Sequence, residues 1–423
     1  MSAIERPPEI DNGLLHFLTC GSVDDGKSTL IGRLLYDSKA ILADTLCAIS
    51  TSSQRRGMSS VDLSLLTDGL QAEREQGITI DVAYRYFASG RRKYIVADAP
   101  GHEQYTRNMV TAASTADLAI ILVDARLGIL SQSRRHAAIA HLMGIAHLVV
   151  AVNKMDLVGH SEQRFDEIRA DFLAFSRKIG IDNARFIPIS ALNGDMIVER
   201  GGNLVWYQGP TLIETLDSSS AVHDAANRPL RFPVQFVCRP QNSEQRDFRG
   251  YTGRIESGQI AQGDPVTVLP AGRATRVRDI QLHGRSMPCA SAGQSVAIRL
   301  EDDIDVSRGD MIVKAEEAPK VVQALDATVC WLDEHPLDPK RSYLLRHTTR
   351  ETRASISAIS HHLDINTLER GPAAQLLTND IARVQFKLSQ PLCVDAYAMN
   401  RATGAFIIID ESSNRTVGAG MIL

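Results

Sequence analysis

Features that would assign the chain to a secreted, membrane-spanning or dedicated nucleic-acid-binding class are missing. Its 423 residues carry a formal net charge of −4, whereas nucleic-acid binders usually present a strongly basic face. The longest strongly apolar run is residues 118–123. A helix that spans a bilayer needs about 20 apolar residues. Residues 1–12 also lack the apolar core of a signal peptide. We therefore expect a cytoplasmic protein that binds neither a membrane nor nucleic acid.

Paired cysteines are missing as well. The chain has six cysteines and no C-x-x-C pair among them. They are Cys20, Cys47, Cys238, Cys289, Cys330 and Cys393. This spacing predicts neither a zinc site nor a disulfide framework, and it favours buried or free thiols in a reducing compartment.

What the chain does contain, up to about residue 217, is an alternation of short apolar runs and amphipathic stretches. The runs predicted as buried strands are residues 14–20, 94–97, 118–123, 148–152 and 185–189. The stretches with helical spacing are residues 27–36, 106–114, 132–143 and 161–179. Such alternation predicts a mostly parallel sheet covered on both faces. A further strand, residues 79–87, is joined to the strand at 94–97 by a hairpin-like turn and predicts one antiparallel edge strand.

The pattern changes after a polar, proline-terminated stretch at residues 217–229. Beyond it, glycine and proline punctuate short alternating runs, which is typical of small antiparallel β-barrels. These runs are residues 232–237, 253–255, 265–269, 276–282 and 295–300. A charged break at residues 314–319 predicts a second barrel. We expect an α/β domain at residues 1–226, a β-barrel at residues 227–316 and another at residues 317–423.

A phosphate-binding loop follows the first predicted strand. Residues 21–28 fit G-x-x-x-x-G-K-[ST] and precede a helical stretch. The glycines let backbone N–H groups surround an anion, and the helix N-terminus points at the phosphates. Lys27 is expected to neutralise the β- and γ-phosphates, and the Ser28 hydroxyl to bind Mg²⁺. The residues expected to contact the nucleotide here are Gly21, Ser22, Val23, Asp24, Asp25, Gly26, Lys27, Ser28 and Thr29.

A D-x-P-G turn ends another predicted strand. Asp98 follows residues 94–97, and a carboxylate at that end of a strand is well placed to hold Mg²⁺ through water. Gly101 is expected to bring its N–H to the γ-phosphate. Alone, this sequence is a common turn. After a phosphate-binding loop, its interpretation as a nucleotide contact becomes much stronger.

A third motif indicates that the base is guanine. Asn153, Lys154 and Asp156 form N-K-x-D directly after the strand at residues 148–152. The Asp156 carboxylate can accept hydrogen bonds from guanine N1–H and from the 2-amino group, an arrangement of donors that adenine lacks. Lys154 can lie along the base and the ribose.

A fourth motif follows the last predicted strand of this region. Ser190, Ala191 and Leu192 are expected to place a backbone N–H near guanine O6. Each motif alone is weak, and the information lies in their order along the chain, each at a strand end. The order predicts a P-loop GTPase domain, with GTP and Mg²⁺ as ligands, followed by the two β-barrels.

This arrangement resembles a translation-factor-class GTPase of the elongation factor Tu group, and the resemblance covers nearly the whole chain. It implies that Thr79 closes on Mg²⁺ and the γ-phosphate and that His102 orients the attacking water. Val23 and Ile78 resemble the apolar gate beside that histidine. Without the motif, His102 reads as an ordinary polar loop residue. The catalytic residues that the resemblance implies are His102, Lys27 and Thr79.

Longer strings resemble one branch of that class, the large GTPase subunit of bacterial sulfate adenylyltransferase. They are residues 67–84, 98–109, 246–251 and 417–421. In that family GTP hydrolysis drives the unfavourable adenylylation of sulfate by ATP, which gives adenosine 5′-phosphosulfate and pyrophosphate in sulfate assimilation. Such coupling requires an element with two arrangements, and switch loops ordered by a γ-phosphate are such an element.

Two motifs under which ATP-adenylylating sites are often found, H-x-G-H and S-G-G-x-D-S, are absent. The ATP and sulfate site is therefore expected on a smaller catalytic partner subunit, in a heterodimer or a higher heteromer, as the resemblance also implies. There is no second G-x-x-x-x-G-K-[ST]. We therefore expect no fused adenylylsulfate kinase domain in these 423 residues.

Two alternatives stay open at this point. One is a translation factor that delivers aminoacyl-tRNA, against which the net charge and the longer strings weigh. The other is a non-catalytic, GTP-controlled assembly switch. The chain also departs from translation factors at Asp25, where they commonly carry His before the glycine. The composition of residues 36–66 predicts a mobile segment that orders with GTP or with a partner.

Overall fold

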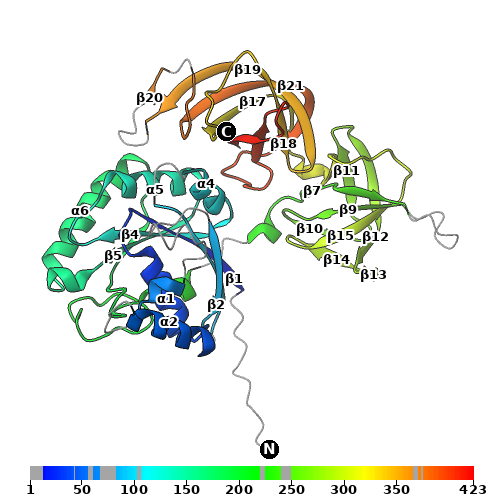
Figure 1. Cartoon of the computed structure of the whole chain (residues 1–423). Helices are drawn as coiled ribbons and strands as arrows, with labels where there is room; N and C mark the ends of the chain where they lie inside the picture. The colour runs from blue at the N-terminus through cyan, green and yellow to red at the C-terminus, as the bar shows by residue number, and fades with distance from the viewer. Residues whose placement is uncertain are drawn as a thin grey trace, which may run out of the picture. The chain divides into compact units, whose positions relative to one another are not determined.

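A computed structural model describes residues 13–41, 43–55, 61–66, 82–101, 106–219, 224–239, 249–364, 370–372 and 375–423. The chain divides into two compact units, Met1–Val222 and His223–Leu423, which Figure 1 colours from blue to green and from green to red. Among the described residues, no helix is long and apolar enough to cross a membrane. All six cysteines are free thiols.

A six-stranded sheet forms the centre of the first unit. Its strands are β1 (Leu14–Gly21), β2 (Ala83–Ala88), β3 (Lys93–Asp98), β4 (Leu118–Asp124), β5 (His147–Asn153) and β6 (Ala184–Pro188), in the order β2-β3-β1-β4-β5-β6. β2 runs antiparallel to β3 and every other pair is parallel. The predicted parallel sheet with one antiparallel edge is therefore confirmed. Every residue of β4 is buried, as expected of a parallel strand covered on both faces.

Helices cover both faces of this sheet. They are α1 (Lys27–Asp37), α2 (Ala43–Arg55), α4 (Thr106–Thr115), α5 (Ser131–Leu142), α6 (Glu162–Lys178) and α7 (Leu212–Ser218), with short 3₁₀ helices η1 (Leu63–Leu66) and η3 (Met155–Val158). Figure 1 shows α4 and α5 on one face and α1 and α2 on the other. Helix α2 and η1 lie where composition predicted a mobile segment, because the apolar side chains of Ile49 and Leu63 are buried there.

Helix α7 occupies the start of the stretch that was predicted as a linker. Thr211 and Glu214 form a capping box at its N-terminus: the Thr211 hydroxyl accepts the Glu214 N–H, and the Glu214 carboxylate accepts the Thr211 N–H. Near its end, Asp217 accepts hydrogen bonds from Ser89 Oγ and from the Tyr94 hydroxyl. These bonds fasten the helix to the β2–β3 hairpin. The capping-box sequence was the signal that could have predicted it.

The second unit contains two antiparallel barrels. The main sheet of the first has the order β7-β16-β11-β12-β15-β9-β8. Its strands are β7 (Phe232–Pro233), β8 (Phe236–Cys238), β9 (Gly250–Arg254), β11 (Pro265–Leu269), β12 (Arg273–Leu282), β15 (Ser295–Leu300) and β16 (Met311–Lys314). Strand β13 (Arg285–Met287) pairs with β12, and β10 (Gln259–Ala261) pairs with β14 (Cys289–Ser291). Because β7 and β8 are successive parts of one segment, their pairings with β16 and β9 close the barrel.

The second barrel has longer strands. They are β17 (Lys320–Trp331), β18 (Ser342–His347), β19 (Arg350–Leu363), β20 (Arg370–Gly371), β21 (Ile381–Val394), β22 (Ala405–Ile409) and β23 (Thr416–Ile422). Their order is β18-β22-β23-β17-β21-β19-β20, and a further pairing of β18 with β19 closes the ring. Buried Trp331, Phe386 and Phe406 lie in its core. The predicted fold class, an α/β GTPase-like domain followed by antiparallel barrels, is confirmed.

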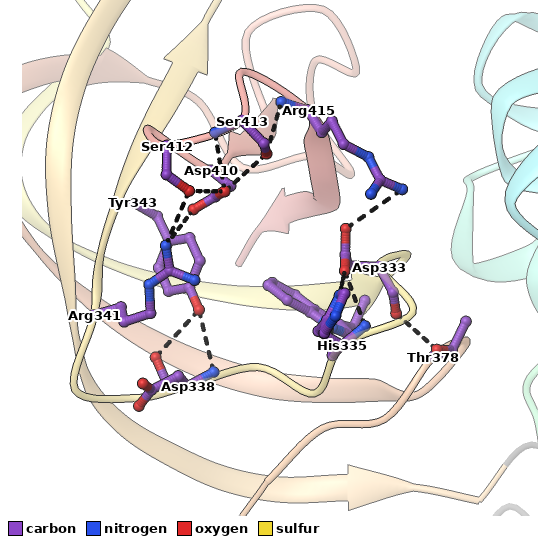
Figure 2. A network of polar contacts seen from close by, with 11 residues as sticks. Asp333, His335, Asp338, Arg341, Tyr343, Thr378, Asp410, Ser412, Ser413 and Arg415 are labelled. Carbon is purple, nitrogen blue, oxygen red and sulfur yellow. Dashed lines mark hydrogen bonds and ion pairs between the residues drawn. The ribbon is translucent and has the colours of Figure 1, made fainter.

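A polar network holds the loops at one end of this barrel (Figure 2). Asp410 accepts hydrogen bonds from Ser412 Oγ at 2.6 Å, from Ser413 Oγ at 2.8 Å and from the Arg341 guanidinium at 2.6 Å. Nearby, Asp333 accepts from the His335 N–H at 2.9 Å. The β22–β23 turn is therefore fixed mainly by one carboxylate.

Candidate functional site

The phosphate-binding loop connects β1 to α1 at the carboxyl edge of the sheet. Gly26 lies at the N-cap of α1 with φ +90°, and no side chain caps the helix, so its first N–H groups stay available to an anion. A Cβ on Gly26 would lie 2.5 Å from Asn153 Nδ2. Both the backbone angle and this close approach require glycine.

Lys27, near the end of the phosphate-binding loop, is buried against the start of that loop. Its ammonium donates to the carbonyl oxygens of Gly21, at 3.2 Å, and Ser22, at 2.9 Å. Burial lowers the pKa of Lys27, and the neighbouring carboxylates of Asp98 and Asp25 oppose that shift. Because its hydrogen bonds to described residues go to two neutral carbonyls, the ammonium is suited to exchange them for phosphate oxygens.

The D-x-P-G turn lies against this lysine. A Cβ on Gly101 would lie 2.6 Å from Lys27 Nζ and 2.7 Å from the Gly21 carbonyl, so glycine is required for the close approach. Asp98 ends β3 and is 3% exposed. Thr19 of β1 donates its hydroxyl to Asp98 Oδ1 at 3.3 Å. A carboxylate, a lysine and the start of a helix thus meet at one point, a donor set that suits a metal-bound phosphate.

Asn153 joins the base-recognition motifs to the phosphate loop. Its Nδ2 donates to the Asp25 carbonyl at 2.7 Å, and its Oδ1 accepts the Ala191 N–H at 2.9 Å. Ser190 Oγ donates to Asp156 Oδ1 at 2.7 Å, and none of the described residues donates to the second oxygen of this carboxylate, which can accept from a ligand. The structure therefore brings the first, third and fourth motifs together.

Lys154 is held between two acidic positions. It adopts the left-handed region with φ 63°, and its ammonium contacts Asp124 Oδ2 at 2.9 Å and donates to the Asp24 carbonyl. Asp124 ends β4 and is 1% exposed. Although burial opposes ionisation, hydrogen bonds from Arg126 and Lys154 lower the pKa of Asp124 to about 2. Sequence reasoning missed Asp124. Its position after a predicted strand, like that of Asp98, was the available signal.

Asp25 places a carboxylate inside the phosphate loop. It is 2% exposed, and its Oδ2 accepts the Ser22 N–H at 2.5 Å. Burial raises its pKa to about 6, against the opposing effects of the Ser22 hydrogen bond and Lys27. The remaining loop residues differ in exposure: Val23 is 39% exposed, whereas Ser28 and Thr29 lie in the first turn of α1, half buried.

The two predicted switch residues, Thr79 and His102, lie outside the described residues, as does Ile78. Three of the four long family-specific strings, residues 67–84, 98–109 and 246–251, are likewise described only in part. The described residues contain no group of three or more His, Cys, Asp or Glu side chains that could hold a metal by themselves. A Mg²⁺ site made of one hydroxyl, one carboxylate and nucleotide phosphates does not require such a group.

Two family models match the chain. Residues 12–221 match the elongation factor Tu GTP-binding domain, and residues 324–423 match the C-terminal-domain-like model of GTP-eEF1A. The first match contains all the motifs assembled above. The second covers the barrel from within β17 to the last residue.

Curated relatives match over nearly the whole length. Sulfate adenylyltransferase subunit 1 of Laribacter hongkongensis is 52% identical over 412 residues, which are 97% of this chain and 85% of the relative. The same subunit of Pseudoalteromonas atlantica is 50% identical over 97% of this chain and 87% of its own. The bifunctional enzyme CysN/CysC of Mycobacterium tuberculosis is 52% identical over 97% of this chain and 67% of that enzyme.

Proposed function

The chain belongs to the sulfate adenylyltransferase subunit 1 family, and from that membership and its site we propose that it is the GTP-hydrolysing subunit of a heteromeric sulfate adenylyltransferase. GTP hydrolysis at residues 21–28 drives the reaction of ATP and sulfate to adenosine 5′-phosphosulfate and pyrophosphate. One observation carries the proposal: in a chain 52% identical to a named subunit 1, Asn153 and Lys154 bind the phosphate loop directly. Phosphate binding and base recognition therefore form one site.

The phosphates bind at the start of α1. Backbone N–H groups of the loop and the Lys27 ammonium receive the phosphate oxygens, and Gly101 supplies an N–H beside them. Ser28 and, through water, Asp98 would hold Mg²⁺, and the ion would supply positive charge beside the phosphates. The resemblance to elongation factor Tu adds Thr79 as a further Mg²⁺ ligand.

Guanine binds at the other end of the same site, beside the N-K-x-D motif and the Ser190–Leu192 loop. The free oxygen of Asp156 accepts from the base, Lys154 lies along it, and the Ser190–Leu192 loop supplies an N–H to O6. The low pKa of Asp124 keeps a negative charge beside Lys154 throughout the physiological pH range. The lysine is thereby kept in place before GTP arrives.

The adenylylation site lies on a smaller partner subunit, because the chain has neither H-x-G-H nor S-G-G-x-D-S. We assign residues 1–226 to the GTPase domain and residues 227–316 and 317–423 to the two barrels, which serve partner binding. The complex works in the cytoplasm, where GTP and ATP are both supplied. The names of the curated relatives do not favour a translation factor or a non-catalytic switch.

The test is reconstitution with the partner subunit. We expect adenosine phosphosulfate formation from ATP and sulfate to depend on GTP, with phosphate released from GTP as it forms. Formation of adenosine phosphosulfate at the same rate with and without GTP would contradict the proposal. Hydrolysis stimulated by ribosomes would support the translation factor, and slow hydrolysis that only times partner release would support the assembly switch.

We predict that His102→Ala retains GTP binding and loses at least about a hundredfold in hydrolysis, because water-positioning residues have effects of that size. Nucleotide titration and single-turnover phosphate release measure the two properties separately. Equal turnover in the variant and the wild type would remove His102 from the mechanism.

A further inference from the structure

Arg33 connects helix α1 to the loop that carries Ser190, Ala191 and Leu192. Its Nε donates to the Ala191 carbonyl at 3.3 Å, and its Nη2 donates to the Leu192 carbonyl at 2.5 Å. These carbonyls lie 158 and 159 positions further along the chain. One side chain on the phosphate-binding helix thus contacts the base-recognition loop twice.

The guanidinium is itself held in place. Arg33 Nη1 lies 3.5 Å from Asp37 Oδ1, one helical turn away, and the side chain is 19% exposed. Its guanidinium carbon lies 5.7 Å from the centre of the Tyr36 ring. Because a planar fork of donors loses little freedom when it is fixed in this way, arginine suits a positioning role.

The loop leaves one backbone donor free. The N–H groups of Ser190, Ala191, Asn193 and Gly194 donate to Asp195 O, Asn153 Oδ1, Ser190 Oγ and Ser190 O, respectively. None of the described residues accepts a hydrogen bond from the Leu192 N–H. The Ala191 carbonyl and the Leu192 N–H share one trans peptide and point in opposite directions. When Arg33 holds that carbonyl, the free N–H is turned away from α1.

From this arrangement we propose that Arg33 is a positioning residue for guanine recognition, which fixes the Leu192 N–H so that it donates to O6 of the base. The inference rests on the proposed GTP site and adds a residue that none of the four motifs contains. Through α1, the same side chain also links base recognition to the phosphate-binding end of the site.

The test uses three diphosphates whose bases differ at single groups: GDP, 6-thio-GDP, in which a weak sulfur acceptor replaces O6, and IDP, which lacks the 2-amino group. Their dissociation constants are measured on the full chain by titration calorimetry. We expect wild type to bind GDP about tenfold more tightly than 6-thio-GDP, as one hydrogen bond to a good acceptor allows.

Arg33→Met keeps most of the side-chain length and removes the donors. We expect it to weaken GDP about tenfold and 6-thio-GDP little, while the ratio of GDP to IDP, which reports Asp156, stays at the wild-type value. Arg33→Lys, which keeps one donor at a time, gives an intermediate ratio of GDP to 6-thio-GDP. If Arg33→Met fails to fold, this lysine variant decides the question.

Arg200→Met is the matched control, because Arg200 also donates to backbone carbonyls, those of Tyr207 and Gly209, away from the nucleotide. It should match wild type with all three diphosphates. A wild-type ratio of GDP to 6-thio-GDP in Arg33→Met would overturn the inference. A wild type that does not prefer GDP to IDP would instead contradict the proposed guanine site, and the inference with it.

Discussion

The phosphate-binding loop, whose backbone N–H groups are expected to bind an anion, contains a buried carboxylate, that of Asp25. Asp25 accepts the Ser22 N–H through this carboxylate and the Asn153 amide through its own carbonyl. It therefore fixes the loop from inside, at the position where translation factors commonly carry histidine. Its raised pKa of about 6 shows that ionisation at neutral pH has a free-energy cost.

We predict that Asp25→Asn stabilises the nucleotide-free GTPase unit at pH 7.5. An acid whose pKa is higher in the folded chain binds more protons when folded, so its contribution to the unfolding free energy falls as pH rises from about 4 to about 6 and stays low above that. Asparagine keeps the acceptor and cannot ionise. The gain is at most about 3 kcal/mol, because the pKa of Asp25 rises from 3.8 to about 6.

Thermal unfolding at pH 7.5 and pH 5 measures this effect. The midpoint of the variant should exceed that of wild type at pH 7.5, and the difference should shrink at pH 5. A variant that is less stable than wild type at pH 7.5 would show that the charge of Asp25 stabilises the loop.

At the scale of single elements, the β22–β23 turn is a small unit whose geometry one side chain dictates (Figure 2). Hydrogen bonds from Ser412 and Ser413 lower the pKa of Asp410 to about 2. A carboxylate whose pKa is lowered in the folded protein stabilises it. This stabilisation is fully present above the pKa of the unfolded chain, about 4, and is lost as pH falls through the folded pKa of about 2.

We predict that Asp410→Asn destabilises the second unit by about 1 kcal/mol at pH 7, because charged hydrogen bonds become neutral ones. The deficit should stay constant from pH 7 to pH 5 and shrink only below about pH 4. Urea unfolding of both proteins at several pH values provides the measurement. A deficit that already disappears at pH 6 would contradict the assigned role of the carboxylate.

The elements of the first unit were largely predictable from the sequence. Each of the five predicted parallel strands overlaps an observed one, because buried strands are continuous apolar runs whose ends are marked by polar motifs. Helices α2 and α7 were missed. The polar composition of α2 (Ala43–Arg55) did not indicate a helix. Helix α7 (Leu212–Ser218) was missed because its last two residues belong to the stretch at 217–229 that was predicted as a linker.

The candidate site was predictable only where its residues form local motifs. Asp156 and Ser190 both belong to such motifs, and the structure adds the hydrogen bond between them. Arg33 and Asp124 belong to none, since their roles depend on contacts with residues far along the chain. No pattern within a short window of sequence contains that information.

At the scale of the whole molecule, one buried ion pair joins the two barrels of the second unit. Arg231, which is 4% exposed, donates to both oxygens of Asp395 at 2.8 Å and to the Glu317 carbonyl at 2.7 Å. Asn400 adds a bond to Ser257 Oγ at 3.0 Å. These polar groups of each barrel therefore find hydrogen-bond partners in the other barrel.

We predict that Arg231→Met destabilises the second unit by about 3 kcal/mol, because it leaves the Asp395 carboxylate, which is 15% exposed, without its cation. Calorimetry of the full chain measures this as a lower or split transition of the second unit. Arg353→Met is the control, since Arg353 pairs with Glu411 while 72% exposed, and it should cost less than about 1 kcal/mol. Equal effects of the two variants would contradict the assigned role of Arg231.

The central claim is that the nucleotide bound to this chain drives adenylylation on its partner, and a change of base specificity tests it most directly. Asp156→Asn should prefer xanthosine triphosphate, because asparagine can donate to the 2-oxygen of xanthine. In the reconstituted complex, with ATP and sulfate unchanged, we predict that adenosine phosphosulfate formation by this variant follows xanthosine triphosphate and no longer GTP. Formation that still follows GTP, or that needs neither nucleotide, would contradict the account.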